Sequence, residues 1–527
     1  MRRPEIGRYR ISNGGKFTVM KTTPIATLLT ASMLALSPLA AQTLEEFEKS
    51  VTQHTLGNGM RFFIVERHAV PVVSFHLYAD VGSVDEENGE SGMAHMFEHM
   101  AFKGTKEIGT TNYPEEKKAM EKVDEVVAAL REERRKRERA DPERVRELEE
   151  ALKRAQEEAD QYVIRDQFSQ ILEQAGAVGL NASTSMDATR YFYSLPSNKL
   201  ELWFSLESDR FLNPVLREFY KERDVVIEER RMRVESQPVG NLLEDFLSVA
   251  YQAHPYSRET IGWYSDLQNL TRPAAEEFFS QFYTPPNLTA FIVGDVDPQE
   301  AIRLAELYFG RIPHGPPPQG LWTEEPPQEG ERRTTVYTEA QPLIIMGYHK
   351  PSVTHADDAV FDAVQDILSG GRTSRMYRSL VEEKKIAVAA GGFSGFPGEK
   401  YPNLFLFLAY PTPGHTNEEN EEALLAEIER LQTELITDEE LHRVKSRARA
   451  RLVSQLDSNS GLASQLAAFQ VLTGDWRNRF RTLDDIDRVT REDIQRVANT
   501  YFTERNRTVG YLLTDTLDGR SAGRTTP

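Results

Sequence analysis

The chain has 527 residues, of which 39% are apolar and 28% are charged, and its formal net charge is −19. This length and composition predict several buried cores and two or more domains. The chain contains no cysteine, which excludes disulfide frameworks, thiol catalysis and Cys-ligated zinc or iron–sulfur sites. Any metal chemistry must therefore use histidine and carboxylate ligands, and the acidic charge argues against nucleic acid as a partner.

The first 41 residues predict a secretory signal peptide. Basic residues precede an apolar run over residues 24–36, and the sequence SPLAAQ offers a small-residue cleavage site after Ala41. Met20 is favoured over Met1 as the true start. We expect export to a bacterial periplasm, cleavage near Ala41 and no stable membrane insertion afterwards, with an uncleaved membrane anchor as the alternative.

A first domain is predicted over residues 42–313. Strand-like runs such as RFFIVE at 61–66 and PVVSFHLYADV at 71–81 precede helix-like segments, and TAFIVGDV at 289–296 closes the domain. This order of elements predicts an α+β sandwich, in which helices pack on a mixed sheet.

The pentapeptide HMFEH at residues 95–99 points to metal chemistry. On a helix, His95 and His99 lie one turn apart on one face, about 5–6 Å from each other, so both imidazoles can reach one metal ion. Glu98 lies beside them and can take a proton from a metal-activated water and deliver it to a leaving amine. This inverted HExxH order is a zinc-peptidase signature. The alternative is a surface helix with two incidental histidines.

The segment over residues 114–173 interrupts the pattern of the first domain. It is rich in Glu, Lys, Arg and Ala, and its apolar residues recur at alternating spacings of three and four. Asp141 followed by Pro142 is typical of an N-cap with proline at the first helical position. The segment predicts an inserted antiparallel coiled-coil hairpin that turns near Ala140, with helices roughly 40 Å long. It is either a solvated spacer or a docking arm for another protein.

Two imidazoles leave a tetrahedral zinc site short of one protein ligand. The charged helix predicted over residues 221–235 offers Glu222, Glu228 and Glu229. Glu222 and Glu229 are seven residues apart and share one face of a helix. This spacing does not choose among the three carboxylates, and an exposed acidic helix is the alternative for each.

A Pro- and Gly-rich segment over residues 314–333 has the composition of an interdomain linker. Residues 334–515 then repeat the order of the first domain, with strands predicted at 342–349 and 404–410 and a helix from about 357 to 368. The fold class is therefore α+β, with two homologous α/β sandwich halves. Residues 516–527 are predicted to be a disordered tail.

The sequence GSVDEENGESGMAHMFEHMAFKGT at residues 82–105 resembles the zinc-site signature of the pitrilysin/insulinase superfamily of HxxEH metallopeptidases, especially its mitochondrial-processing-peptidase-like branch. The match continues at residues 179–196, in ERDVVIEERRM and at residues 254–298. It covers nearly all of residues 52–513 except the hairpin. The resemblance implies two halves that close as a clamshell around an enclosed chamber, the second half lacking the metal motif.

The resemblance also implies a role for particular residues. His95, His99 and Glu229 would hold one Zn²⁺ per chain, with Glu98 as the catalytic base. Glu222 would support the site by orienting a ligating imidazole. In this family a strand edge near the site binds the substrate backbone by adding it to the sheet. Asn181 and Ala182 match that edge, and a turn or strand-end role is the alternative for Asn181.

One feature of the family pattern is missing from the second half. Where the family carries an Arg and, seven residues later, a Tyr that hold the substrate carbonyl and the developing oxyanion, this chain has Val381 and Val388. Loss of an oxyanion donor costs about 2.7–4 kcal/mol of transition-state stabilisation. We therefore expect a heterodimer in which a homologous subunit supplies the Arg/Tyr pair. Arg372 or Arg375 could instead take its place.

The sequence predicts a periplasmic zinc endopeptidase that hydrolyses peptides or unfolded polypeptide segments, as the metal-bearing subunit of a heterodimer. The alternative is a non-catalytic scaffold or assembly subunit that only resembles a peptidase. The intact HxxEH motif and Glu229 argue against a scaffold, whereas the missing Arg/Tyr pair argues for one.

Overall fold

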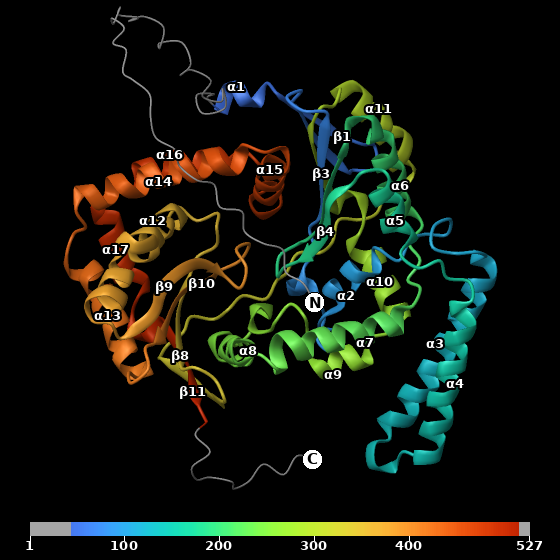
Figure 1. The fold of residues 1–527 in the computed structure, drawn as a ribbon, viewed down its shortest axis with the longest axis horizontal. Coiled ribbons are helices and arrows are strands. Elements are labelled where there is room, and N and C mark those ends of the chain that lie inside the picture. Colours follow the sequence, from blue (N-terminus) through green and yellow to red (C-terminus); the bar gives the residue numbers. More distant parts are fainter. Residues whose placement is uncertain (1–43, 516–527) are drawn as a thin grey trace, which may run out of the picture. The chain divides into compact units, whose positions relative to one another are not determined.

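The structure, a computed structural model, describes residues 44–515. The predicted signal peptide and the predicted tail lie outside the described residues. Two mixed sheets with many helices make up the described part (Figure 1). The first sheet has the strand order β1-β2-β6-β3-β5-β4 and the second the order β7-β11-β8-β10-β9.

The strands of the first sheet come from the first half of the chain, and only β2 and β6 pair in parallel. The central strand β6 is buried along its whole length, whereas buried and half-buried residues alternate along β5. Strand β4 pairs only with β5 and is therefore an edge strand. The strands are β1 (Val51–Thr55), β2 (Arg61–Glu66), β3 (Val72–Ala79), β4 (Val178–Thr184), β5 (Thr189–Pro196) and β6 (Leu288–Gly294).

Helices pack on the first sheet through a large aromatic core. The ring of Phe75 on β3 stacks on Trp203 with centroids 4.6 Å apart, and Phe62 contacts Phe309 edge-on. The sequence predicts such packing because apolar residues recur at helical spacing after each strand. The helices of this half are α2 (Met93–Met100), α5 (Gln167–Gln174), α6 (Leu200–Leu212), α7 (Phe219–Arg230), α9 (Tyr264–Asn269), α10 (Arg272–Phe282) and α11 (Pro298–Tyr308).

The second sheet is built in the same way from the second half of the chain. Strand β9 pairs only with β10 and forms one edge of this sheet. Strand β7 pairs in parallel with β11 and forms the other edge. The strands are β7 (Arg332–Thr338), β8 (Leu343–Lys350), β9 (Ala387–Phe396), β10 (Asn403–Pro411) and β11 (Arg507–Thr514). The helices are α12 (Asp358–Ser369), α13 (Asn417–Thr433), α14 (Asp438–Leu456), α15 (Asn459–Thr473), α16 (Asn478–Arg488) and α17 (Arg491–Tyr501).

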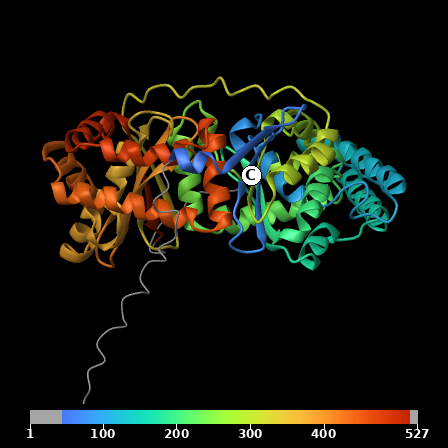
Figure 2. The ribbon, with the colours of Figure 1, turned by 90° about the horizontal axis from the view of Figure 1, so that it is seen from above.

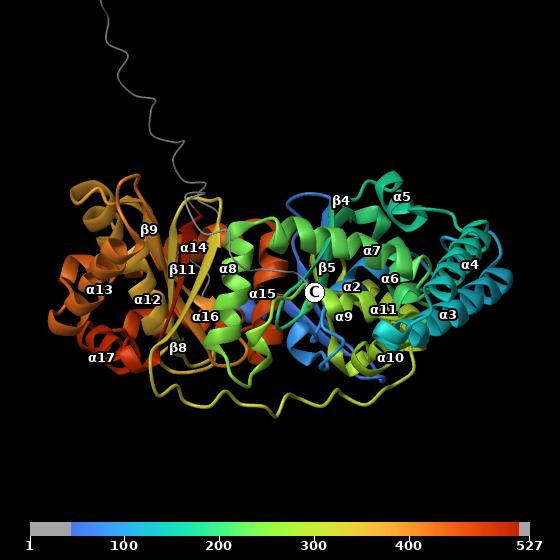
Figure 3. The ribbon, with the colours of Figure 1, turned by 90° about the horizontal axis from the view of Figure 1, so that it is seen from below.

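Each half lends one helix to the other sheet. Helix α8 (Pro238–Ala250) follows α7 in the first half but packs on β7 and β11 of the second sheet, and α15 packs on β3 and β6 of the first (Figure 3). The ring of Phe246 on α8 is fully buried. A Cβ at Gly347 on β8 would lie 2.8 Å from that ring, so the sheet carries glycine where α8 approaches it. The two halves therefore share part of their cores.

Two helices, α3 (Tyr113–Arg135) and α4 (Pro142–Asp160), contact each other within the segment predicted as an inserted hairpin. Asp141 is the N-cap of α4 and accepts a hydrogen bond from the N–H of Glu143 at 2.9 Å. The helices have 23 and 19 residues, so they are about 34 and 28 Å long rather than 40 Å. The hairpin ends at Asp160, and α5 is a separate helix within the predicted segment 114–173.

Residues 313–331 form neither helix nor strand (Figure 2). The carboxylate of Glu325 accepts hydrogen bonds from the backbone N–H groups of Gln252, Ala253 and His254 at 2.8, 2.9 and 3.0 Å. This segment, within the predicted linker, is therefore held against the end of α8 by three charge-assisted hydrogen bonds.

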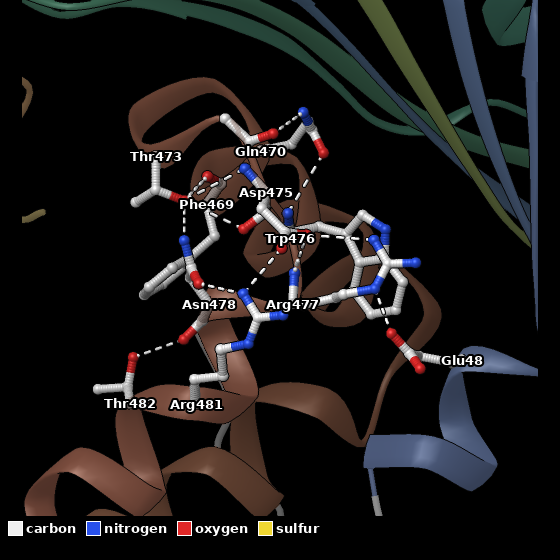
Figure 4. Close-up of polar contacts among 11 residues, drawn as sticks. Glu48, Phe469, Gln470, Thr473, Asp475, Trp476, Arg477, Asn478, Arg481 and Thr482 are labelled. Carbon is white, nitrogen blue, oxygen red and sulfur yellow. Dashed lines mark hydrogen bonds and ion pairs between the residues drawn. The ribbon is translucent and has the colours of Figure 1, made fainter.

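Helix α1 (Leu44–Glu48) precedes the first strand and contacts the second half. The ring of Phe47 packs on Trp476 and Phe480, with centroids 5.8 and 4.8 Å apart. Glu48 forms an ion pair with Arg477, in the turn between α15 and α16 (Figure 4). Among residues 44–515, no helix combines the length and apolar composition that crossing a bilayer requires.

Candidate metal centre

Helix α2 carries the HMFEH motif and is held rigidly at its first turn. The carboxylate of Glu86 accepts hydrogen bonds from the N–H groups of Gly92 and Ala94, at 3.0 and 2.8 Å. These N–H groups would otherwise lack partners, because the first turn of a helix has none within the helix. Gly92 has φ +89°, and a Cβ there would lie 2.6 Å from the carbonyl oxygen of Ile261. Only glycine fits this position.

Glu229 on α7 meets the two histidines of α2. Its Oε2 lies 3.8 Å from Nε2 of His95 and 3.4 Å from Nε2 of His99. One potential ligand atom from each of the three residues lies within 4.8 Å of the others. His95 is buried, and His99 and Glu229 are half-buried. The structure therefore brings together the three residues that the family resemblance implied as ligands.

Glu222 lies two helical turns before Glu229 on α7 and contacts His99 from the side opposite to Glu229. Its Oε1 is 2.9 Å from Nδ1 of His99, and its Oε2 is 2.6 Å from Nζ of Lys103. With Nδ1 engaged by Glu222, His99 presents Nε2 to Glu229. Glu228, the third carboxylate considered, is 58% exposed and pairs with Arg231.

The ionisation of these groups follows from burial and their mutual contacts. Burial and the neighbouring His99 lower the pKa of His95 to about 4. Burial opposes the charged form of His99, but hydrogen bonds to Glu222 and Glu229 outweigh it and raise the pKa to about 9. The hydrogen bond with His99 lowers the pKa of Glu229. His95 is thus a neutral imidazole at neutral pH, with a lone pair available to a metal.

Glu98 directly precedes His99 on α2 and is half-buried. Burial raises the pKa of its carboxyl, and hydrogen bonding with Thr184, the last residue of β4, offsets part of that rise. A carboxylate whose pKa is moved toward neutrality can both accept and return a proton. The raised pKa and the position of Glu98 next to His99 on α2 are consistent with proton transfer beside the cluster.

The two residues expected to contact substrate lie on β4. Asn181 is exposed and Ala182 is buried, and the Oδ1 of Asn181 accepts a hydrogen bond from the N–H of Ala182 at 2.9 Å. Asn181 is thus within an edge strand and not in a turn. An edge strand presents backbone groups that an added strand can pair with.

No polar side chain stands at the two valine positions of the second half. Val381 packs against the core of that half, and Val388 on the edge strand β9 is 57% exposed. Arg375, one possible substitute donor, forms two hydrogen bonds to Glu440, at 2.8 and 3.0 Å. Arg372, the other one, is exposed in a short 3-10 helix.

Several residues around the cluster were not predicted from the sequence: Glu86, Lys103, Thr184 and Arg233. Arg233 is the one that a local rule could have found, because it lies four residues after Glu229 on the same helix face. Its Nη1 is 2.7 Å from Oε1 of Glu229, which leaves Oε2 facing the histidines. Glu86 and Thr184 contact α2 only through the tertiary fold, so their sequence positions carry no such signal.

Two family models match the chain. The one described as "Insulinase (Peptidase family M16)" matches residues 61–130 and 157–263, and the one described as "Peptidase M16 inactive domain" matches residues 269–448. The unmatched residues 131–156 are the far part of the hairpin. Zinc protease PqqE of Helicobacter pylori is 30% identical over 472 residues, which cover 87% of this chain and 91% of that protein. The uncharacterized zinc protease YmxG of Bacillus subtilis is 22% identical, over 86% and 96%.

Solved structures show the same architecture. A protease from Helicobacter pylori superposes with a TM-score of 0.73 at 28% identity, over 88% of this chain and 99% of that chain. An M16 inactive-domain protein from Pseudomonas fluorescens superposes with a TM-score of 0.70 at 15% identity, over 89% and 99%. The predicted α+β fold with two halves is confirmed. The relatives' names imply a peptidase-like function and a zinc cofactor. The chain therefore belongs to the insulinase family of peptidases, family M16, within the pitrilysin/insulinase superfamily.

Proposed function

We propose that this chain is a zinc-dependent endopeptidase in which His95, His99 and Glu229 hold one zinc ion and Glu98 is the catalytic base. The observation that carries the proposal is the convergence of ligand atoms from α2 and α7 within 4.8 Å of one another, with Glu98 directly before His99 on α2. A fold that places two imidazoles and a carboxylate in this way, about 130 residues apart in the chain, fits a metal site better than an incidental surface cluster.

The residues present fit zinc. Two imidazole nitrogens and one carboxylate oxygen are one of the ligand sets of catalytic zinc sites, which keep a fourth position open. The hydrogen bond from Nδ1 of His99 to Glu222 fixes the ring so that Nε2 faces the other ligands, as second partners of zinc-bound histidines do. A zinc ion bound there would act as a Lewis acid and bring the pKa of a water molecule near neutrality.

The chain's own residues then supply positioning and proton transfer. The substrate backbone adds to β4 as an extra strand. In the described structure the N–H of Ala182 donates to Oδ1 of Asn181. When substrate binds, this N–H donates to the substrate backbone instead. Glu98, next to Thr184 at the end of β4, accepts the proton of the attacking water. It then delivers this proton to the leaving amine, so that the carboxylate is restored.

Two further parts of the proposal rest on the sequence. The valines at 381 and 388 support a heterodimer in which a homologous subunit supplies an Arg/Tyr pair and closes the chamber. The composition of residues 1–41 supports export to a periplasm, with cleavage near Ala41. Peptides or unfolded polypeptide segments are the substrate class that an enclosed chamber would admit.

The substitution Glu98→Gln tests the proposed base. We expect peptide hydrolysis by the holo complex to fall about 10²- to 10⁴-fold, because the amide cannot accept the proton, while about one zinc ion per chain stays bound. The matched control is Glu87→Gln, since Glu87 is an exposed glutamate of the same half. The measurements are cleavage of a fluorogenic peptide and zinc content by atomic absorption.

Two results would contradict the proposal. Unchanged turnover by the Glu98→Gln variant would remove Glu98 from the chemistry. Wild-type chain that binds no zinc when zinc is supplied in excess would favour the scaffold alternative, because a scaffold requires no metal.

A further inference from the structure

The proposed ligands lie on two helices that are far apart in the chain, so something must fix the distance between those helices. Arg217 lies two residues before α7 begins, and its side chain is 1% exposed. Its guanidinium reaches the loop that leaves the end of α2, residues 101–112. It therefore joins the start of the helix that carries Glu229 to the exit of the helix that carries both histidines.

The guanidinium uses its whole hydrogen-bonding capacity in this joint. Nη2 donates to the carbonyl oxygen of Thr105 at 2.7 Å, and Nη1 donates to those of Ile108, at 3.0 Å, and Lys103. Nε donates to Oε1 of Glu116 on α3 at 2.8 Å, and Nη2 also reaches Oε2 at 3.3 Å. Glu116 is 0% exposed, so the ion pair is fully buried.

The loop is shaped around this side chain. Gly104 and Gly109 have φ +95° and +90°, and a Cβ at these positions would lie 2.9 and 2.6 Å from Nη1 of Arg217. Both the backbone conformation and the space therefore require glycine. Three carbonyl oxygens of this loop turn toward one guanidinium, an arrangement that the point charge of lysine cannot reproduce.

The same loop contacts the proposed site through Lys103. The carbonyl oxygen of Lys103 accepts a hydrogen bond from Arg217, and its Nζ forms an ion pair with Oε2 of Glu222 at 2.6 Å. Glu222 in turn holds Nδ1 of His99. A change in the loop is thereby transmitted to the ring orientation of His99 as well as to the spacing of the two helices.

We infer that Arg217 is a positioning residue for the metal centre: it fixes α2 against α7 so that Glu229 stands at ligand distance from His95 and His99. This inference rests on the proposed function, because it assigns Arg217 a role in holding zinc. Arg217 touches neither the ligand atoms nor the substrate strand, and acts through the loop and α7.

If Arg217 only stabilised the fold, a change at any other buried ion pair would have the same effect on zinc binding. The chain offers such a pair, matched to Arg217 and Glu116 in burial and residue types. Arg210 and Glu207 on α6 form an ion pair with side chains 2% and 1% exposed. Arg210 packs over the rings of Phe168 and Tyr191 and over that of Phe102 in the loop after α2, and it hydrogen bonds to Glu207. The described structure shows no hydrogen bond from Arg210 to α2, to α7 or to the loop between α2 and α3. Arg210→Lys keeps a cation near these rings and breaks no hydrogen bond to the backbone of the loop, so it is a control for lost stability without loss of the carbonyl contacts.

The experiment compares wild type, Arg217→Lys and Arg210→Lys. The zinc dissociation constant is measured by competition with a chelator, at a temperature where thermal melts show each variant folded. We expect Arg217→Lys to raise that constant about 10- to 100-fold, as loss of supporting partners of a metal site does, and Arg210→Lys to leave it within about 3-fold. With cobalt in place of zinc, the visible absorption of Arg217→Lys should also change, since the ligand geometry changes.

Glu116→Gln is the second variant, for the case that Arg217→Lys does not fold. It keeps the shape of the joint and removes its charge, and it should weaken zinc binding in the same direction. An unchanged dissociation constant in the folded Arg217 or Glu116 variant would overturn the inference, as would an equal rise in Arg210→Lys. Failure of the proposed function gives a different result, because wild type and Glu229→Gln would then show the same absence of tight zinc binding.

Discussion

The hydrogen bond between Glu222 and His99 determines which nitrogen of that histidine faces Glu229. Nδ1 of His99 lies 2.9 Å from Oε1 of Glu222, and Nε2 lies 3.4 Å from Oε2 of Glu229. Burial alone would raise the pKa of Glu222, but hydrogen bonds from His99 and Lys103 outweigh it and lower that pKa to about 2. Glu222 is thus ionised at any pH at which the protein would work, and it holds the ring in one orientation.

Replacing Glu222 should weaken zinc binding without removing a ligand. We expect Glu222→Ala to raise the zinc dissociation constant about 10- to 100-fold, because Nδ1 of His99 loses the acceptor that orients the ring. Chelator competition measures the constant. The control is Glu228→Ala on the same helix, whose side chain is 58% exposed and pairs only with Arg231 among the described residues. Equal effects of the two substitutions on the zinc dissociation constant would show that Glu222 does not support the metal site by orienting His99.

Within a single helix, α12 shows how burial makes stability depend on pH. Asp362 lies on this helix among carboxyl groups, and burial and the nearby Asp358 raise its pKa from 3.8 to about 7. Asp358 itself is paired with Lys350 at 3.0 Å. Because the folded state of Asp362 holds its proton more tightly than the unfolded state, the stability of the fold decreases as the pH rises from about 4 to about 7.

The substitution Asp362→Asn should remove that pH dependence. Asparagine resembles the protonated acid, so we expect little change in the free energy of unfolding near pH 4, where the unfolded state also begins to hold the proton. At about pH 8 we expect the variant to be more stable than wild type by about 1 to 3 kcal/mol. Urea unfolding at the two pH values measures the difference, with the exposed Asp484→Asn as the control. A variant that is less stable than wild type at the higher pH would contradict the assignment.

At the scale of the molecule, the two halves are joined by the helices that they exchange. Phe246 on α8 is 0% exposed and lies in a cluster with Ile345, Leu406 and Leu512 of the second sheet. Truncating a buried phenylalanine removes its transfer free energy and leaves a cavity. The stability of the second half therefore depends on a helix from the first.

We expect Phe246→Ala to lower the free energy of unfolding by about 3–5 kcal/mol, measured by chemical denaturation. Val239→Ala on the same helix should change it by less than about 0.5 kcal/mol, since Val239 is 36% exposed. Hydrogen exchange should report faster opening of β7 and β11 in Phe246→Ala. Unchanged exchange in these strands would mean that α8 contributes little to the second sheet.

The absence of the Arg/Tyr pair predicts that the chain needs a partner subunit for full activity. We expect the purified chain alone, loaded with zinc, to hydrolyse peptides about 10²- to 10³-fold more slowly than the complex purified from its native source, because an oxyanion donor is lacking. Native mass spectrometry would identify the composition of the complex. A lone chain as active as the complex would show that Arg372, Arg375 or another group supplies the donor.

The local part of the site could be predicted from the sequence. The spacing of His95 and His99 places two imidazoles on one helix face because 3.6 residues make a turn, and this holds in any fold. Strands β2, β3, β6, β8 and β10 followed from apolar runs in the sequence, and Asp141 with Pro142 marked the start of α4 for a similarly local reason. The fold of two halves followed from repeated order and from the family resemblance.

Only the tertiary structure placed Glu229 next to the histidines while leaving Glu228 exposed to solvent, and it brought Arg217 to the loop after α2. It also showed that α8 of the first half covers the second sheet and that α15 of the second half covers the first sheet. The physical reason is that these contacts join residues far apart in sequence. The spacing of residues along a helix or strand records which side chains share a face, but it holds no information about which distant face they meet. That pairing is decided by how the buried surfaces of the whole chain pack together.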